Sequence, residues 1–207
     1  MGKYYRSNDD RVLVSDLETL YQPAIQWLQA ELPADRFNHS LRVAKLAYNL
    51  GEFHRIDTPE YAYLAGILHD NAKYKHPDML HQSGIAKPHC YYDLYAAYPA
   101  IWHAFAGPRQ VLHITKNRLV LHAMRWHTTG RARLHPIAKL VYLADYCEPG
   151  RPASAWRDAI RTLAYRDLDT AIGLCAHRQI TQHTLDCFWA TQACWRYYRW
   201  RPDTWLP

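Results

Sequence analysis

The residue most informative about chemistry is Asp145, a carboxylate inside the mostly apolar stretch of residues 140–147. At helical spacing, Asp145 extends the apolar stripe formed by Ile137, Val141 and Ala144, so its side chain is expected to point into the core. An uncompensated carboxylate there would cost several kcal/mol of stability. A metal ion or a buried ion pair with a Lys or Arg could compensate it, and Asp145 alone does not decide between the two.

Histidines on other inward-facing helix surfaces favour a metal. His39 lies on the same helical face as Val43 and Leu50, and His127 lies on an apolar face of its own segment. A single histidine on such a face is usually a hydrogen-bonded core residue, but three separate helices that each carry an inward ligand point to a shared ion. Imidazole and carboxylate together suit iron, zinc, manganese or a similar divalent ion.

His69 and Asp70 form a second unusual pair, and their adjacency restricts how they can act. Neighbouring residues on an ideal helix point about 100° apart. The pair can therefore hold one metal from two sides only near a helix end or a distortion, or else Asp70 leans toward a second ion. Lys73 follows Asp70 by three residues and lies near the same face, where it either meets a phosphate or is a solvated lysine at a helix end.

The chain resembles the HD-domain phosphohydrolases, all-helical enzymes with an H…HD…D ligand pattern, through His39, His69, Asp70 and Asp145. Longer strings narrow the resemblance, namely residues 36–44 around the first ligand and residues 127–131 and 142–151 around the last. These strings are similar to the YqeK-like bacterial HD-domain family, whose members cut diadenosine tetraphosphate symmetrically into two ADP. The resemblance covers about residues 36–185.

The resemblance implies an all-α fold, an HD-domain helical bundle over residues 36–185. Residues 1–35 are then a short N-terminal helical extension, and residues 186–207 are a C-terminal extension rich in aromatic and basic side chains. Aromatic and basic residues interleaved in this way could stack nucleic-acid bases. We favour instead that the C-terminal extension docks onto the domain or onto the second subunit of a homodimer.

The chemistry implied by the resemblance is hydrolysis of a phosphoanhydride by a metal-activated water. We predict one or two divalent transition-metal ions, with iron favoured, and the predicted metal ligands are His39, His69, Asp70 and Asp145. The predicted catalytic residues are Asp70, which would orient the water, and Lys73. His103 and His127 either contact phosphate or serve a second ion. The residues predicted to bind the substrate are Lys73, His103, His127, Thr128 and Arg151.

Two departures from the family limit what the resemblance implies. Residues 103–104 read His-Ala where the family usually has His-Gly, and residues 180–186 match the family's string only in part. The second departure leaves nucleoside recognition at the C-terminal end unassigned. Two alternatives are an HD-domain phosphohydrolase that acts on another nucleotide or phosphoester, and a weakly active nucleotide-binding regulator. Intact ligands at every core position argue against the regulator.

The composition of the whole chain narrows the partners and the location. Its 207 residues, 49% of them hydrophobic, suffice for one domain with an appendage and argue against disorder. A net charge of +6 favours an anionic partner such as a nucleotide, whereas the scattered basic residues argue against nucleic acid. Five cysteines without a C-x-x-C spacing, no apolar secretion signal and no apolar run of about eighteen residues predict a cytoplasmic protein without a membrane segment.

Helix signals define the elements that must position these residues. We predict one or two helices over residues 12–31, broken by Pro23, and further helices over residues 37–53, 60–73, 117–127 and from Pro136 through Asp145. The period-2 alternation of a half-buried sheet is missing. Residues 74–100, interrupted by prolines and a glycine, either cover the site as a lid or pack against the outside of the bundle, and we favour the second.

Overall fold

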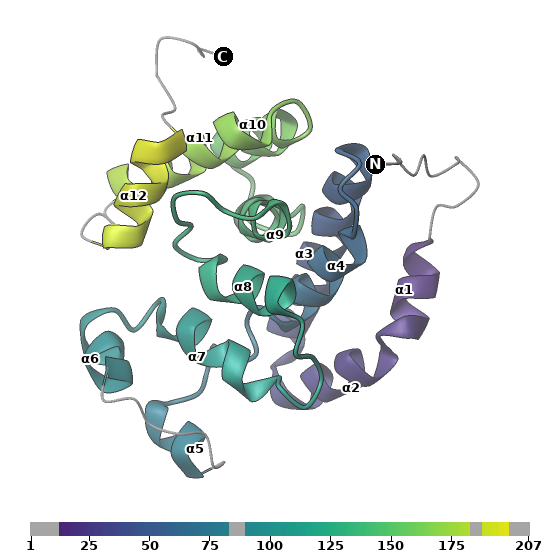
Figure 1. Cartoon of the computed structure of the whole chain (residues 1–207), viewed down its shortest axis with the longest axis vertical. Helices are drawn as coiled ribbons and strands as arrows, with labels where there is room; N and C mark the ends of the chain where they lie inside the picture. Colours follow the sequence, from purple (N-terminus) through teal and green to yellow (C-terminus); the bar gives the residue numbers. More distant parts are fainter. Residues whose placement is uncertain (1–12, 83–89, 183–187, 199–207) are drawn as a thin grey trace, which may run out of the picture.

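The structure is a computed structural model that describes residues 13–82, 90–182 and 188–198. The regular elements of these residues are all α-helices, which confirms the predicted all-α fold (Figure 1). In chain order they are α1 (Val14–Leu20), α2 (Gln22–Glu31), α3 (Ala34–Phe53), α4 (Pro59–Leu68), α5 (Pro77–Gln82), α6 (Cys90–Ala97), α7 (Trp102–Gln110), α8 (Arg118–Trp126), α9 (Pro136–Cys147), α10 (Ala155–Ala164), α11 (Leu168–Thr181) and α12 (Trp189–Tyr198). Within the described ranges, no helix is long and apolar enough to span a bilayer.

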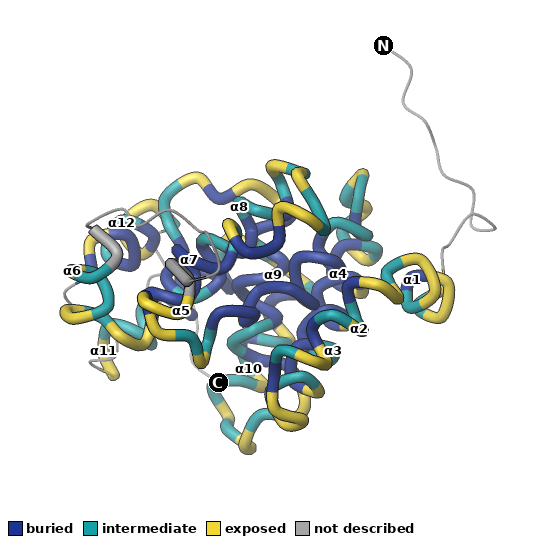
Figure 2. The backbone as a smooth tube through the Cα atoms, turned by 90° about the horizontal axis from the view of Figure 1, so that it is seen from below, coloured by how far each residue is buried: buried dark blue, intermediate teal, exposed yellow. Residues whose placement is uncertain are grey.

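Helix α9 lies at the centre of the bundle (Figures 1 and 2). It packs against α3, α4, α8, α10 and α11, and buried apolar side chains occur around most of its circumference. A helix of that composition is stable only when neighbouring helices cover it on all sides. Asp145 lies in the last turn of α9, so a helix packed against five others fixes its position.

Helices α3 and α4 meet at Gly66 without an intervening side chain. A Cβ atom placed on Gly66 would lie 2.6 Å from Cα of Ala44, a distance that real Cβ atoms essentially never show. Only glycine therefore allows this approach of the two backbones. The contact sets the spacing between the helix that carries His39 and the helix that leads into His69.

Helix α4 ends five residues earlier than the predicted range of 60–73, and the residues that follow it form turns. The carbonyl oxygen of Gly66 accepts a hydrogen bond from Nδ1 of His69 at 2.7 Å. The turn continues through short-range bonds from the N–H of Asn71 to Leu68 and from the N–H of Lys73 to Asp70. This early end supplies the helix terminus that the His69-Asp70 pair requires.

The N-terminal segment forms two helices, with Pro23 in the first turn of α2. Leu17 of α1 and Leu28 of α2 are buried in the same hydrophobic core as α3, α4 and α9. Helix α3 begins at Ala34, two residues before the predicted start of the HD bundle. The described part of the extension thus completes the core, and the division into three segments stays a prediction.

Residues 77–110 form three helices that the sequence did not predict, α5, α6 and α7. Helices α5 and α6 lie at the periphery of the bundle (Figure 1). The ring of Tyr95 lies 5.5 Å from that of Trp102, and the ring of Tyr98 lies 5.2 Å from that of Phe188. These contacts support packing on the outside of the bundle for the described part of the segment.

Helix α12 packs against α11 of the same chain, which supports docking of the C-terminal extension onto the domain. The thiols of Cys147, Cys175 and Cys194 are free and buried. Burial raises the pKa of Cys147 and Cys194 to about 12, so both remain protonated at neutral pH. The side chains of Cys90 and Cys187 lie outside the described residues, as do the predicted aromatic and basic residues from 199 to 205.

Candidate metal centre and active site

The four predicted metal ligands converge on one point, although they come from α3, from the turn after α4 and from α9. Nε2 of His39 lies 3.0 Å from Oδ1 of Asp145 and 3.9 Å from Oδ2 of Asp70. Nε2 of His69 lies 3.4 Å from Oδ2 of Asp70 and 3.7 Å from Oδ1 of Asp145. Ligand atoms of His39, His69 and Asp145 all lie within 4.8 Å of one another, a spacing that could hold a metal ion.

The orientation of the histidines fits a metal. Nδ1 of His69 donates to the carbonyl of Gly66 at 2.7 Å, and Nδ1 of His39 donates to Oε1 of Glu148 at 3.1 Å. Each bond fixes the ring and turns Nε2 toward the centre. Nε2 of His69 is buried without a hydrogen-bond partner among the described residues. A metal ion bound at the centre would give this buried nitrogen a partner and would neutralise the two carboxylates beside it.

Both carboxylates of the centre are ionised at neutral pH. Burial opposes ionisation of Asp70, but the neighbouring His69 and hydrogen bonds from histidines hold its pKa well below the usual range. Burial opposes ionisation of Asp145 too, but the imidazoles of His39 and His69 beside it, together with the charge of Arg151, hold its pKa well below the usual range. The side chain of Asp145 is 16% exposed, so it faces a cavity rather than the closed apolar core that its helical stripe predicted.

His103 and His127 lie on the other side of Asp70. Nε2 of His103 is 3.0 Å from Oδ1 of Asp70 and 3.1 Å from Nε2 of His127. Burial lowers the pKa of His103 to about 4 and also lowers that of His127, so both rings are neutral near pH 7. His69, Asp70 and His127 form a second group close enough to hold an ion. This group contains His127 but not His103, so a second ion at His103 and His127 stays a prediction.

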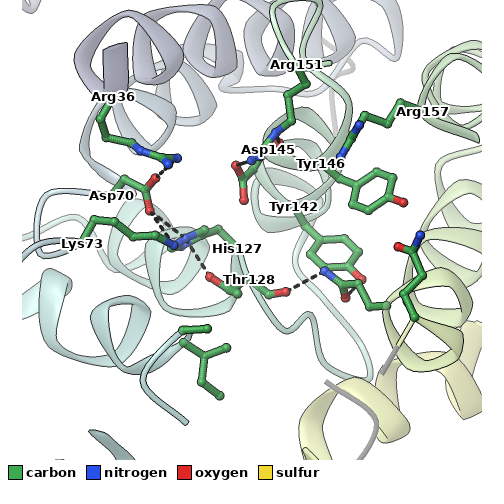
Figure 3. A pocket seen from close by; sticks show the side chains of 14 residues that line it. Arg36, Asp70, Lys73, His127, Thr128, Tyr142, Asp145, Tyr146, Arg151 and Arg157 are labelled. Carbon is green, nitrogen blue, oxygen red and sulfur yellow. Dashed lines mark hydrogen bonds and ion pairs between the residues drawn. The ribbon is translucent and has the colours of Figure 1, made fainter. Parts of the chain in front are cut away.

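A cavity of about 320 Å³ opens beside this centre (Figure 3). Of the residues predicted to bind substrate, Lys73, His127, Thr128 and Arg151 line it, whereas His103 is not among the lining residues and contacts His127 and Asp70. Nζ of Lys73 is 3.9 Å from Oδ1 of Asp70 and 3.4 Å from Nε2 of His103. The guanidinium of Arg151 donates to the carbonyl oxygen of Asp145 at 2.7 Å and to its Oδ1 at 2.5 Å.

Two residues of the site were missed by sequence reasoning. Arg36 donates to Oδ2 of Asp70 at 3.0 Å and lines the cavity. Glu148 is buried, accepts from His39 and also accepts from Nε of Arg42 at 2.7 Å. Spacing places both beside predicted ligands, because Arg36 precedes His39 by one helical turn and Glu148 follows Asp145 by three residues, but it does not show what they contact.

The comparison with family models decides the family. The model of the HD domain matches residues 36–150, more than half of the chain. The chain belongs to the HD domain family. All four predicted metal ligands of this HD domain lie inside the matched range, as do the predicted substrate-binding residues up to Thr128.

Relatives of this HD domain include enzymes of known name. The chain is 34% identical to "Bis(5'-nucleosyl)-tetraphosphatase, symmetrical" of Staphylococcus aureus, over 84% of this chain and 91% of that protein. It is 32% identical to the protein of the same name from Bacillus subtilis, over 73% and 81% of the two chains.

A solved structure also resembles this HD domain. A crystal structure from Clostridium acetobutylicum, described as a predicted HD superfamily hydrolase involved in NAD metabolism, superposes with a TM-score of 0.74 at 28% identity. The superposition covers 86% of this chain and 96% of that one. The shared fold therefore extends beyond the range that the HD-domain model matches.

Proposed function

We propose that this HD-domain protein is a symmetrical bis(5'-nucleosyl)-tetraphosphatase, which hydrolyses diadenosine tetraphosphate to two ADP. The convergence of two histidines and two ionised carboxylates on a cavity lined by Lys73, Arg36 and Arg151 carries the proposal. Cations suit a polyphosphate, and the buried ligand set suits a metal-dependent hydrolase. Similarity to the Staphylococcus aureus relative over most of both chains supports this choice of substrate.

The residues that would hold the metal are His39, His69, Asp70 and Asp145. When bound, a divalent ion supplies activation of a water molecule and neutralisation of charge on the phosphoryl oxygens. Imidazole and carboxylate donors support a transition metal, and iron is our proposal among these. A second ion at His103 and His127, a homodimer and a cytoplasmic location belong to the same proposal.

The other residues of the site would bind the phosphates of the substrate and orient the attacking water. Lys73 and Arg151 lie on either side of the carboxylates, where each can meet a phosphate oxygen, and the planar guanidinium of Arg151 can donate two hydrogen bonds to one phosphate. The hydroxyl of Thr128, 2.9 Å from Nε2 of His127, adds a neutral donor. Asp70 stays ionised and can accept a hydrogen bond from the attacking water, which orients it toward phosphorus.

Product analysis tests the proposed function. The purified protein should convert diadenosine tetraphosphate to ADP alone, because a centre that acts on the middle of the tetraphosphate leaves a nucleoside diphosphate on each side. In oxygen-18 water, one of every two ADP molecules should carry one labelled oxygen, detected by mass spectrometry. Formation of AMP and ATP would contradict symmetrical cleavage. Inertness toward this substrate beside rapid hydrolysis of a nucleoside monophosphate would favour another phosphohydrolase activity.

Lys73→Ala is expected to lower kcat/KM by roughly ten- to a thousandfold, because a charge-assisted contact to a phosphate is worth about 1.5–4 kcal/mol. Metal content should stay normal, because Lys73 is not a ligand. Steady-state kinetics and elemental analysis measure the two effects. Lys75→Ala is the matched control, since Lys75 pairs with Glu31 outside the cavity. Wild-type kinetics in the Lys73 variant would show a solvated lysine without a role.

A further inference from the structure

The cavity extends beyond the metal ligands to a second group of side chains. Figure 3 shows Asp70, Lys73 and His127 at one end and Tyr146 with Arg157 at the other, with Asp145 between them. Gln182, at the end of α11, also lines the cavity. None of Tyr146, Arg157 and Gln182 is needed to hold the metal or the phosphates beside it.

Arg157 differs from the other cations of the cavity. Arg36, Lys73 and Arg151 each lie within 4.0 Å of a carboxylate of the metal centre, whereas Arg157 forms no ion pair with a carboxylate among the described residues. Its guanidinium carbon lies 5.8 Å from the centre of the Tyr146 ring. The cation is thus placed against an aromatic face rather than against an acid.

The hydrogen-bonding edge of Arg157 is poorly placed for a phosphate. Its Nη1 donates to the carbonyl of Pro152 at 2.9 Å, and its Nε is buried without a partner. A bidentate grip on phosphate uses two parallel N–H groups, either those of the two Nη atoms or those of Nε and one Nη. One nitrogen of the first pair already donates to Pro152 and Nε of the second is buried, so neither pair is fully open to a ligand. The flat face of the guanidinium, with the ring of Tyr146, is what this arginine can offer.

The wall beside Tyr146 is fixed by hydrogen bonds. Nε2 of Gln179 donates to the carbonyl of Thr128 at 2.9 Å, and Oε1 of Gln179 accepts from the hydroxyl of Tyr142 at 2.8 Å. This bridge joins the segment after α8 to α9 and α11. The region beyond the phosphates therefore combines aromatic and amide groups.

We propose that Tyr146, Arg157 and Gln182 form the subsite for the nucleobase of one half of the substrate. The base would stack on the aromatic and guanidinium surfaces, as bases do in nucleic-acid complexes. The amide of the exposed Gln182 would hydrogen-bond to the edge of the base. This inference rests on the proposed function for the identity of the substrate, and it assigns the nucleoside recognition that the sequence left open.

Binding of two probes to the purified protein with its metal tests the subsite. Isothermal titration calorimetry would measure the affinity for ADP, which carries a base, and for inorganic pyrophosphate, which does not. Arg157→Ala and Gln182→Ala should each weaken ADP binding, by about tenfold for the arginine, because stacking of a base contributes at this scale. Pyrophosphate affinity should stay within about twofold in both variants, which also shows that the fold and the phosphate site are intact.

Arg157→Lys separates stacking from charge. Lysine keeps the positive charge but lacks the planar guanidinium, so it should weaken ADP binding as much as alanine does. Arg166→Ala, which removes an exposed arginine outside the cavity, is the control for net charge. Equal loss of ADP and pyrophosphate affinity, rescue by lysine, or unchanged ADP affinity in Arg157→Ala would each overturn the subsite.

The two proposals fail separately. Absence of diadenosine tetraphosphate cleavage by the wild-type protein would refute the proposed function, and the ADP-selective loss would still support the base site. Normal cleavage with unchanged ADP affinity in the variants would leave the function standing and refute the base site.

Discussion

Asp145→Ala is expected to abolish turnover of diadenosine tetraphosphate, with a loss in kcat of more than about a thousandfold, since removal of even one transition-state donor costs 10²–10³ in other enzymes. Oδ1 of Asp145 lies 3.0 Å from Nε2 of His39 and 3.7 Å from Nε2 of His69. Its removal therefore takes away the proposed carboxylate ligand that faces both histidines. It also leaves the guanidinium of Arg151 without its carboxylate partner. Kinetics and metal content of the same preparation measure the effect.

Two further variants test whether the loss of kcat is specific to carboxylates of the metal centre. Asp70→Ala should have an effect of the same size, because Asp70 contacts both groups of histidines. Asp169→Ala removes a carboxylate that is 57% exposed and pairs with Lys139, and it should change kcat by less than about twofold. An Asp145→Ala protein that kept its metal and a tenth of its activity would contradict the assignment of Asp145 as a ligand.

Purified protein is expected to contain about one equivalent or more of a transition metal, and removal of that metal by a chelator should eliminate activity. Nε2 of His69 is buried without a hydrogen-bond partner among the described residues, and the two ionised carboxylates beside it favour a cation in addition to the arginines, Arg36 and Arg151, that pair with them. Elemental analysis gives the content, and addition of iron to the stripped protein should restore turnover.

Thermal unfolding provides a second readout of the metal. An ion that binds only the folded state at a hundred times its dissociation constant stabilises it by about 2.7 kcal/mol, so chelation should lower Tm by several degrees. Less than about a tenth of an equivalent of any transition metal, with activity and Tm insensitive to chelator, would refute a metal-dependent hydrolase.

The sequence singled out the four residues that we propose as metal ligands, because each lies on a helical stripe or in a recognisable pair. His39 and Asp145 share their helix faces with apolar residues, and periodicity alone is enough to see that. Glu148 escaped notice because its role depends on a contact with His39 across 109 residues. Arg36 lay inside a recognised string, but periodicity could not show that its guanidinium reaches Asp70.

Element boundaries were less predictable where side chains compete with the backbone. The predicted helix over 60–73 ends at Leu68, because the imidazole of His69 takes the carbonyl of Gly66 as its partner. Helices α5 to α7 were missed because local proline and glycine signals suggested an irregular segment, whereas packing of Tyr95 on Trp102 comes only from the assembled fold. No local signal in the sequence could therefore separate a lid, the less favoured alternative, from packing on the outside of the bundle.

The contact of α3 with α4 at Gly66 has a consequence for the order in which the site is assembled during synthesis and folding. These two helices are consecutive in the chain, and contacts local in sequence form early. His39, by contrast, meets Asp145 across 106 residues. A nascent helical hairpin can therefore orient two imidazoles before α9 has been made. We expect the imidazoles of His39 and His69 to be positioned as soon as the hairpin of α3 and α4 forms. The carboxylate of Asp145 would join them only after most of the chain has been synthesised.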